Sequence, residues 1–248
     1  MVKKKQVIVV GGGAAGMVAA ISAQRLGAMV TILERNPRVG KKILATGNGR
    51  CNFTNINAGI ANYHGENAKF AFSALSSFTP YDTIDFFEKL GIQHKVEDLG
   101  KVYPMSDQAS SILDVLLYEL NEVGVKIVCG ALVKAIRKKN RKFTIELEDQ
   151  QTFDGDKVII ATGGKAMPST GSDGNGYSLA TKLGHNMIDI FPALVQLMLV
   201  GDFFNRINGV KFLGTAQIIN ESNVIASDRG DILFANYGVS GPPILQIS

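Results

Sequence analysis

Residues 7–16 read Val7-Ile8-Val9-Val10-Gly11-Gly12-Gly13-Ala14-Ala15-Gly16, an apolar run that leads through glycines into a helix-forming segment. This order predicts a β-strand, a tight turn and then an α-helix. Gly11 allows the positive φ of a tight turn, Gly13 lets the backbone approach a pyrophosphate, and Gly16 lets helix and strand pack closely. The stretch therefore predicts the phosphate cradle of a dinucleotide-binding unit.

The segment after the glycines extends this prediction to a βαβ unit. A helix is expected over residues 14–26, and a second strand over residues 29–33 ends on Glu34. The positive end of the helix dipole favours an anion at the turn. Glu34 stands about 20 residues past the glycines, where a carboxylate accepts both hydroxyl hydrogens of an adenosine ribose and repels a 2′-phosphate. The alternative is that Glu34 merely ends a strand at the surface.

Composition describes an ordinary globular chain of one or two domains. The 248 residues are 46% apolar and 19% charged, and the net charge of +4 is spread along the sequence. The densest basic runs, at residues 3–5, 41–42 and 137–142, do not alternate with aromatic residues. Solvated surface is therefore favoured over a nucleic-acid groove. No window is apolar for the length that a membrane span needs.

Cysteine and histidine usage gives no catalytic or metal pattern. Cys51 and Cys129 form neither a disulfide framework nor a metal-ligand spacing, which suits a reducing cytoplasm. Cys129 closes an apolar run and is expected to be a buried residue at a strand end. The three histidines lie in different segments and are expected at the surface or at helix ends, and no nucleophile is paired with a base.

The middle of the chain alternates helical and strand patterns. A long loop is expected over residues 36–67, helices over 80–90 and 109–123, and a hairpin over 131–137 and 142–148 that turns at Asn140-Arg141. Thr79 is expected to cap the helix over 80–90, and Pro80 is expected to be its first residue. A buried strand over 157–161 runs into the glycine turn at Thr162-Gly163-Gly164. That turn is expected either to meet the dinucleotide or to be a plain connection.

The sequence pattern changes to mostly strand-forming segments beyond Pro192. Residues 169–176 are expected to be a helix-entry loop beside the nucleotide, followed by a helix over 177–183. Strands are expected over 193–200, 211–219, 223–226 and 232–235. We therefore predict a nucleotide-binding domain over residues 1–191 and the start of a β-rich domain over residues 192–248. Only five residues follow a helix start at Pro242-Pro243, so a fragment that stops inside an element is expected.

The glycine turn and Glu34 do not separate FAD from NAD, but the segment from Glu34 to Asn55 does. Its Gly49-Arg50-Cys51-Asn52-Phe53-Thr54-Asn55 run resembles a bacterial family of NAD(P)/FAD-dependent oxidoreductases that includes aminoacetone oxidase-like enzymes and bile-acid reductases. The strand that ends at Gly163-Gly164 and the stretch from Gly230 to Pro242 share this resemblance. It implies an α/β fold with a doubly wound, Rossmann-like, glutathione reductase-like FAD-binding domain and an inserted β-rich substrate domain.

The resemblance also implies a set of cofactor-binding residues. The cofactor that the resemblance implies is FAD, with NADH or NADPH as a further nucleotide. It implies that the pyrophosphate is held by Gly11, Gly13, Ala14, Ala15 and Gly16, and the adenosine end by Glu34 and Arg35. The path toward the flavin is implied at Lys42, Gly49, Arg50, Cys51 and Asn52. The adenine is implied at Val133, and the turn that closes over the adenosine and pyrophosphate at Ala161, Thr162 and Gly163. Family members return to the cofactor domain with a C-terminal Gly-rich segment, so a C-terminally truncated member is expected.

Three functions remain open at this stage. The first is an FAD-dependent oxidoreductase that acts on a small or steroid-like organic molecule, without nucleic acid, membrane or metal as a partner. The second is a flavoprotein that modifies tRNA, which needs a basic patch. The third is a nucleotide-binding module without catalysis. Cys51 beside Arg50 has a further interpretation as a redox thiol with a lowered pKa, set against simple packing or backbone contact with FAD.

Overall fold

The structure, a computed structural model, describes residues 4–46 and 49–248. Lys3, Gly47 and Asn48, which belong to sequence motifs discussed above, lie outside the described residues. The chain divides into two compact units, Met1–Met187 and Ile188–Ser248. The boundary inferred from the sequence was placed after residue 191.

The first unit is built on a four-stranded parallel sheet in the order β10-β1-β2-β6. Its strands are β1 (Gln6–Val10), β2 (Met29–Glu34), β6 (Lys126–Cys129) and β10 (Lys157–Ile160). Helix α1 (Ala14–Arg25) connects β1 to β2, which pair in parallel. The predicted βαβ unit is therefore confirmed, and β1 lies inside the sheet with neighbours on both sides.

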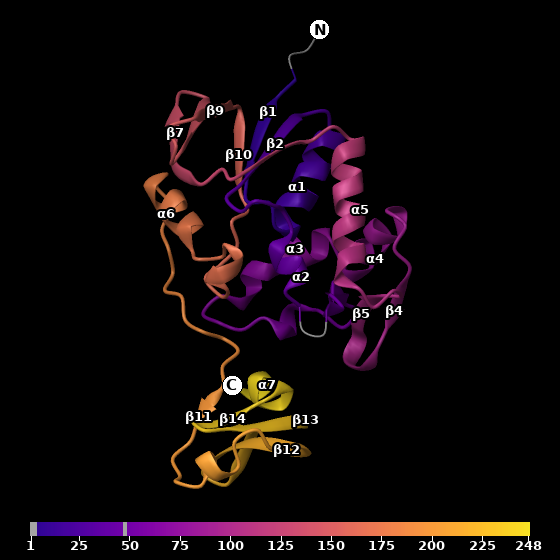
Figure 1. The fold of residues 1–248 in the computed structure, drawn as a ribbon, viewed down its shortest axis with the longest axis vertical. Coiled ribbons are helices and arrows are strands. Elements are labelled where there is room, and N and C mark those ends of the chain that lie inside the picture. The colour runs from indigo at the N-terminus through magenta and orange to yellow at the C-terminus, as the bar shows by residue number, and fades with distance from the viewer. Residues whose placement is uncertain (1–3, 47–48) are drawn as a thin grey trace. The chain divides into compact units, whose positions relative to one another are not determined.

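Both faces of β1 are covered, which explains its continuous apolar run. Val7 and Val9 pack in the core that includes α1 and α5 (Ala109–Glu122), while Ile8 and Val10 pack in a second core on the opposite face. Figure 1 shows α1 and α5 beside the sheet and β7 and β9 on the other side of β10. The doubly wound, Rossmann-like α/β fold is confirmed, with part of one layer supplied by an antiparallel sheet.

That second layer contains the predicted hairpin. It consists of β7 (Val133–Lys139), β8 (Lys142–Leu147) and β9 (Thr152–Gly155), together with α6 (Asn175–Lys182). Lys139 pairs with Lys142 across the turn, and Asn140 adopts a φ of 55°, as a two-residue hairpin turn requires. Strand β9 has no clear pattern in the sequence, because its four residues alternate weakly and acquire their pairing only from β8.

A small antiparallel sheet and short helices occupy the region after β2. The sheet has the order β3-β5-β4. The elements are α2 (Lys41–Leu44), β3 (Thr54–Asn55), α3 (Phe72–Ser77), α4 (Pro80–Lys89), β4 (His94–Val96) and β5 (Lys101–Pro104), with 3-10 turns at Ile60–Asn62, Ala68–Ala71 and Asp98–Gly100. Further 3-10 turns lie elsewhere, Pro168–Thr170 after β10 and Phe204–Arg206 in the second unit. The Thr79 hydroxyl accepts a hydrogen bond from the Asp82 N–H at 3.2 Å, which confirms the predicted cap of α4. The predicted long loop thus contains α2 and β3.

The second unit is a four-stranded antiparallel sheet in the order β11-β14-β13-β12. Its elements are β11 (Leu197–Met198), β12 (Lys211–Asn220), β13 (Asn223–Ala235), β14 (Gly238–Ser240) and α7 (Pro242–Ile247). The prediction of two separate strands over 223–226 and 232–235 is wrong, because both segments belong to the single strand β13. The polar residues between them stay in the strand because β12 continues to pair with them, Gly214 opposite Gly230.

Two burial predictions are also wrong for a shared reason. Cys129 is exposed, and residues 158–160 of β10 are half-buried, although both segments were expected to be buried. Among the described residues, β6 and β10 are the outer strands of the parallel sheet, so each has a neighbouring strand on one side only. In the second unit, only Leu197–Met198 of the strand expected over 193–200 forms a strand.

Within residues 4–46 and 49–248, no helix combines the length and the apolar character needed to cross a lipid bilayer.

Candidate functional site

A cavity of about 790 Å³ lies at the carboxyl ends of the parallel strands in the first unit. Open α/β sheets bind ligands at this edge, because the loops that follow neighbouring strands meet there. The ends of β1, β2 and β10, the start of α1 and the start of α6 all contribute to its wall. Its volume falls within the range of about 300–1,000 Å³ that is typical of small-molecule sites.

The glycine turn between β1 and α1 has the geometry that the sequence predicted. Gly11 has a φ of +104°, and a Cβ placed on it would lie 2.5 Å from the Ala161 carbonyl oxygen. A Cβ on Gly16 would lie 1.9 Å from the Gly11 carbonyl oxygen, so helix and strand approach too closely for any side chain. A Cβ on Gly13 would meet no atom within 4 Å. The turn is therefore closed on the protein side at Gly11 and Gly16 and open at Gly13.

The N-terminus of α1 is available to an anion at this opening. Gly13 is the N-cap and supplies no side chain to the free N–H groups, and the first turn contains no acidic residue. The Met17 N–H donates to the Gly13 carbonyl at 2.9 Å, so the N–H groups of residues 14–16 precede the first intrahelical bond. Ala14 and Ala15 line the cavity. These residues fit the pyrophosphate of a dinucleotide.

Glu34 is buried at the end of β2 and lines the same cavity. Its Oε2 accepts the Gly12 N–H at 2.7 Å, and its Oε1 accepts the Asn36 N–H at 2.8 Å and the Asn36 Nδ2 at 2.7 Å. The carboxylate thus holds the glycine turn against the end of β2. The interpretation of Glu34 as a mere surface strand end is wrong, since the side chain is only 7% exposed.

A loop over residues 168–173 lies against the segment that follows β2. Lys41 Nζ donates to the Ser169 carbonyl at 2.6 Å, Lys42 Nζ donates to the Ser172 hydroxyl at 2.7 Å, and Asn36 Nδ2 donates to the Thr170 carbonyl at 3.1 Å.

An ion pair closes the end of this loop. Arg35 Nη1 and Asp173 Oδ2 are 2.5 Å apart, and the Arg35 guanidinium lowers the pKa of the Asp173 carboxyl from its ordinary value of 3.8. Arg35, Lys42 and Ser172 all line the cavity, so this loop forms part of its wall.

Most of the cofactor-binding residues implied by the resemblance surround this cavity. Gly16 lies beneath the turn and is buried. Of the implied residues, those that line the cavity are Gly11, Gly13, Ala14, Ala15, Glu34, Arg35, Lys42, Val133, Ala161, Thr162 and Gly163. The run Gly49, Arg50, Cys51 and Asn52 does not line it. The binding role of each residue stays a prediction.

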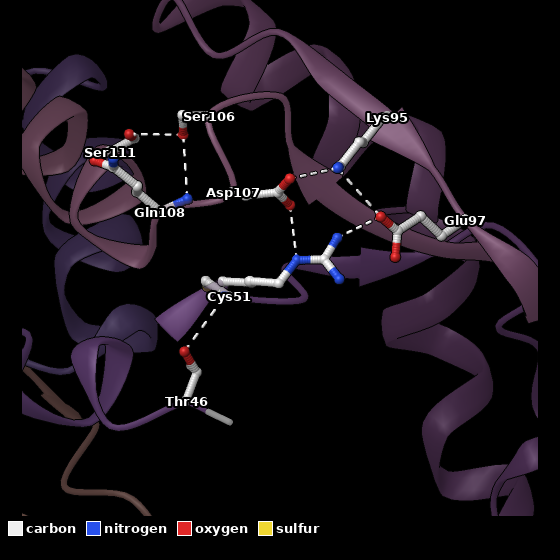
Figure 2. Close-up of polar contacts among 9 residues, drawn as sticks. Thr46, Cys51, Lys95, Glu97, Ser106, Asp107, Gln108 and Ser111 are labelled. Atoms are coloured by element: carbon white, nitrogen blue, oxygen red, sulfur yellow. Dashed lines mark hydrogen bonds and ion pairs between the residues drawn. The ribbon is translucent and has the colours of Figure 1, made fainter. Parts of the chain in front are cut away.

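Arg50 instead belongs to an ion cluster beside β4 and β5. Its guanidinium pairs with Glu97 and, at 2.7 Å, with Asp107, and it lies over the Tyr103 ring at 4.2 Å from the ring centre. Lys95 bridges the same two carboxylates, at 2.6 Å to Asp107 and 3.2 Å to Glu97, as Figure 2 shows. The positive charge of Arg50 is therefore matched by neighbouring carboxylates rather than directed into the described cavity.

These contacts shift the pKa values of the cluster in opposite directions. The hydrogen bond to Glu97, and then that to Asp107, raises the pKa of Arg50. Arg50 is the main cause that lowers the pKa of Glu97 from 4.5, whereas Lys95 is the main cause that lowers the pKa of Asp107 from 3.8. The ionised carboxylates thus stabilise the fold at neutral pH, and that contribution is lost as the pH falls through the lowered pKa values.

We expect Arg50→Met to raise the pKa of Glu97 more than that of Asp107, because Arg50 is the principal partner of Glu97. Lys95→Met is the matched control and should reverse this order. Both pKa values are measured by NMR of the side-chain carboxyl carbons between pH 2 and pH 6, a window that brackets about 3.9 for Asp and about 4.3 for Glu. Equal shifts in both variants would contradict the pairing described here.

Cys51 does not have the lowered thiol pKa that one interpretation required. Burial raises its pKa, and its backbone N–H donates to the Thr46 hydroxyl at 3.3 Å. The side chain packs against the first core, and the residue has a φ of 58°. The adjacent Arg50 charge is engaged by Glu97 and Asp107 and does not offset the effect of burial.

Asn36, Lys41 and Ser172 were not predicted as binding residues, although Ser172 belongs to the loop expected beside the nucleotide. Asn36, Lys41 and Ser172 line the cavity and connect its two sides. Asn36 follows Glu34, the residue expected to bind the ribose, by two positions, and this proximity is the one signal that pointed to it. Nothing in the sequence pattern pairs Lys41 with residue 169, since 128 positions separate them.

Comparison with known proteins matches the chain to a protein family. The model of the HI0933-like protein Rossmann domain matches residues 5–239. A 3-dehydro-bile acid delta(4,6)-reductase of Clostridium scindens is 45% identical over 237 residues, which cover 95% of this chain and 58% of that protein. A ribosomal RNA dihydrouridine synthase of Escherichia coli is 33% identical over 235 residues, with coverage of 95% and 58%.

Solved structures support the same fold. A flavocytochrome c3 fumarate reductase in its open conformation superimposes with a TM-score of 0.55 at 18% identity, over 85% of this chain and 47% of that one. The chain spans about 58% of the length of the curated relatives named above. The similarity to the solved structure supports the fold alone, whereas the sequence matches support membership of the family.

Proposed function

Because this chain belongs to the HI0933-like family of FAD-binding oxidoreductases, we propose that it uses FAD to reduce a small or steroid-like organic substrate, with NADH or NADPH as the reductant. One observation carries the proposal: the N-terminus of α1, which no side chain caps, and the Glu34 carboxylate both line the same cavity. Helix N–H groups that donate to an anion, next to a carboxylate that accepts from ribose hydroxyls, fit the ADP half of FAD.

The residues of the cavity would divide the work of holding that cofactor. The N–H groups at the start of α1 bind the pyrophosphate, and the open space at Gly13 admits it. Glu34 accepts from the adenosine ribose, and Val133 and Ala161 line the wall. The bound flavin supplies hydride transfer between nicotinamide and substrate, while the protein supplies position and electrostatics.

The similarity to the Clostridium scindens reductase supports a steroid-like substrate, since it is 45% identical over 95% of this chain. The similarity to the Escherichia coli ribosomal RNA dihydrouridine synthase, at 33%, supports a second candidate, the reduction of a base in RNA. We favour the first, because the basic runs of this chain carry no interleaved aromatic residues. We propose a cytoplasmic location, because the spacing of Cys51 and Cys129 suits a reducing compartment.

Anaerobic reduction of the purified chain tests the proposal. We expect flavin absorbance bands in the purified protein, loss of these bands on addition of NADH or NADPH, and their return on addition of a 3-dehydro-bile acid with Δ4 and Δ6 double bonds. A matched experiment replaces the bile acid with ribosomal RNA at low and high salt, because binding to RNA phosphates weakens steeply with salt.

The outcomes separate the candidates. Reoxidation by the bile acid alone supports the first function, and reoxidation by RNA alone replaces it with the second. A protein that carries FAD and that no nicotinamide reduces would be a binding module without this catalysis. A colourless protein that takes up no FAD would overturn the cofactor site itself.

A further inference from the structure

The side chain of Asn36 occupies a position between the ribose-binding carboxylate and the 168–173 loop. Its Nδ2 donates to Glu34 Oε1 at 2.7 Å and to the Thr170 carbonyl oxygen at 3.1 Å. An amide nitrogen carries two hydrogens, so both are used. Both neighbours are acceptors, which fixes the end of the amide that faces them. A Cβ on Gly171 would lie 2.7 Å from Asn36 Nδ2, so the loop passes directly against this amide.

The acceptor positions of Glu34 are therefore nearly filled by the protein itself. An ionised carboxylate has about four lone-pair positions, two on each oxygen. Oε1 accepts twice, from the backbone N–H and from the side chain of Asn36, and Oε2 accepts once, from Gly12. Among the hydrogen bonds of residues 4–46 and 49–248, one acceptor position of the carboxylate is left, and it is on Oε2. The sequence alone predicted that Glu34 accepts both ribose hydroxyls.

We propose that Asn36 is a positioning residue that restricts Glu34 to one ribose hydroxyl of the bound nucleotide and links that carboxylate to the 168–173 loop. The inference rests on the proposed binding of the ADP half of FAD at this cavity. Asn36 does not touch the reacting atoms. It sets which oxygen of Glu34 is free, and thereby which hydroxyl of the ribose contributes to affinity.

Deoxynucleotides read out this restriction directly. The full chain is loaded with FAD, and ADP, 2′-deoxy-ADP and 3′-deoxy-ADP are compared as competitors by the release of flavin fluorescence. We expect one deoxy analogue to bind about tenfold or more weakly than ADP, because it loses a hydrogen bond to a charged acceptor. The other should bind within about threefold of ADP.

Asn36→Ala should change this selectivity. Removal of the amide opens one acceptor position on Oε1, which keeps only the backbone N–H of residue 36, so both deoxy analogues should then bind about tenfold or more weakly than ADP. Lys41→Met is the matched control, because Lys41 holds the same loop through the Ser169 carbonyl and makes no contact with Glu34 among the hydrogen bonds of the described residues. That variant should keep the wild-type selectivity, whereas a loop that acted only by its mobility would alter both variants alike.

Each result decides the matter. Equal losses for both deoxy analogues in the wild type, or an unchanged ratio in Asn36→Ala, overturn the role of Asn36 while FAD binding stands. If Asn36→Ala does not fold, the wild-type comparison alone decides. A chain that binds neither FAD nor ADP overturns the proposed function and this inference with it.

Discussion

Glu34→Ala should yield a protein that unfolds at a lower temperature and retains little FAD. The substitution removes the acceptor of the Gly12 N–H and of both Asn36 donors. A buried donor left without an acceptor costs about 1–3 kcal/mol, and each kcal/mol lowers the unfolding midpoint of a chain of this size by about 2–4 °C. The glycine turn loses its anchor at the same time, so we expect FAD affinity to fall at least about tenfold.

Two variants make this result specific. Glu34→Gln keeps the size of the side chain and one carbonyl acceptor, which can serve Asn36, but it places an amide donor opposite the Gly12 N–H. It should therefore lie between the wild type and Glu34→Ala in stability. Glu122→Ala, at the exposed end of α5, is the control and should change neither quantity. Differential scanning calorimetry and flavin content after dialysis measure both. Full flavin content in Glu34→Ala would refute the assignment of Glu34.

Gly13→Ser should lose FAD without loss of stability, whereas Gly16→Ala should lose both. The backbone of Gly13 has a φ of −75°, which any residue adopts, and a Cβ there meets no atom within 4 Å. A serine at this N-cap position bonds to a free N–H of the helix and is at least as good a cap as glycine. Its side chain would occupy the space and the donors that we assign to the pyrophosphate.

Gly16→Ala acts on the fold, because its Cβ would lie 1.9 Å from the Gly11 carbonyl oxygen. The atom it meets belongs to the backbone and cannot rotate away as a flexible side chain would, and overpacking of this kind costs typically about 1–3 kcal/mol. The gain in helix propensity from alanine is at most about 1 kcal/mol and does not offset it.

Gly59→Ala is the control for both glycine variants, since a Cβ there meets no atom within 4 Å and the φ is −151°. Urea unfolding and the FAD dissociation constant measure the two effects, with a change in affinity of at least about tenfold expected for Gly13→Ser. Undiminished affinity in Gly13→Ser would show that no phosphate lies at this opening.

The sequence determined the local parts of this protein. The strand, glycine turn and helix at residues 6–25, the Thr79 cap and the hairpin at Asn140 follow from side-chain periodicity, capping and turn preferences within a few neighbouring residues. The same local pattern identified Glu34 as a residue of the site. The run at residues 49–55 placed the chain in its family.

Only the tertiary structure decided what these parts meet. Cys129 is exposed because β6 is an outer strand among the described residues. Residues 223–235 form one strand because β12 pairs along it between Asn223 and Leu233 and β14 pairs with its end. Arg50 is engaged by carboxylates 47 and 57 residues away. Periodicity carries no information about such distant partners, and hydrogen bonds and ion pairs depend on them. The sequence therefore predicted the glycine turn and Glu34, and the structure shows which donors, Gly12 across the turn and Asn36 beside it, occupy the Glu34 carboxylate.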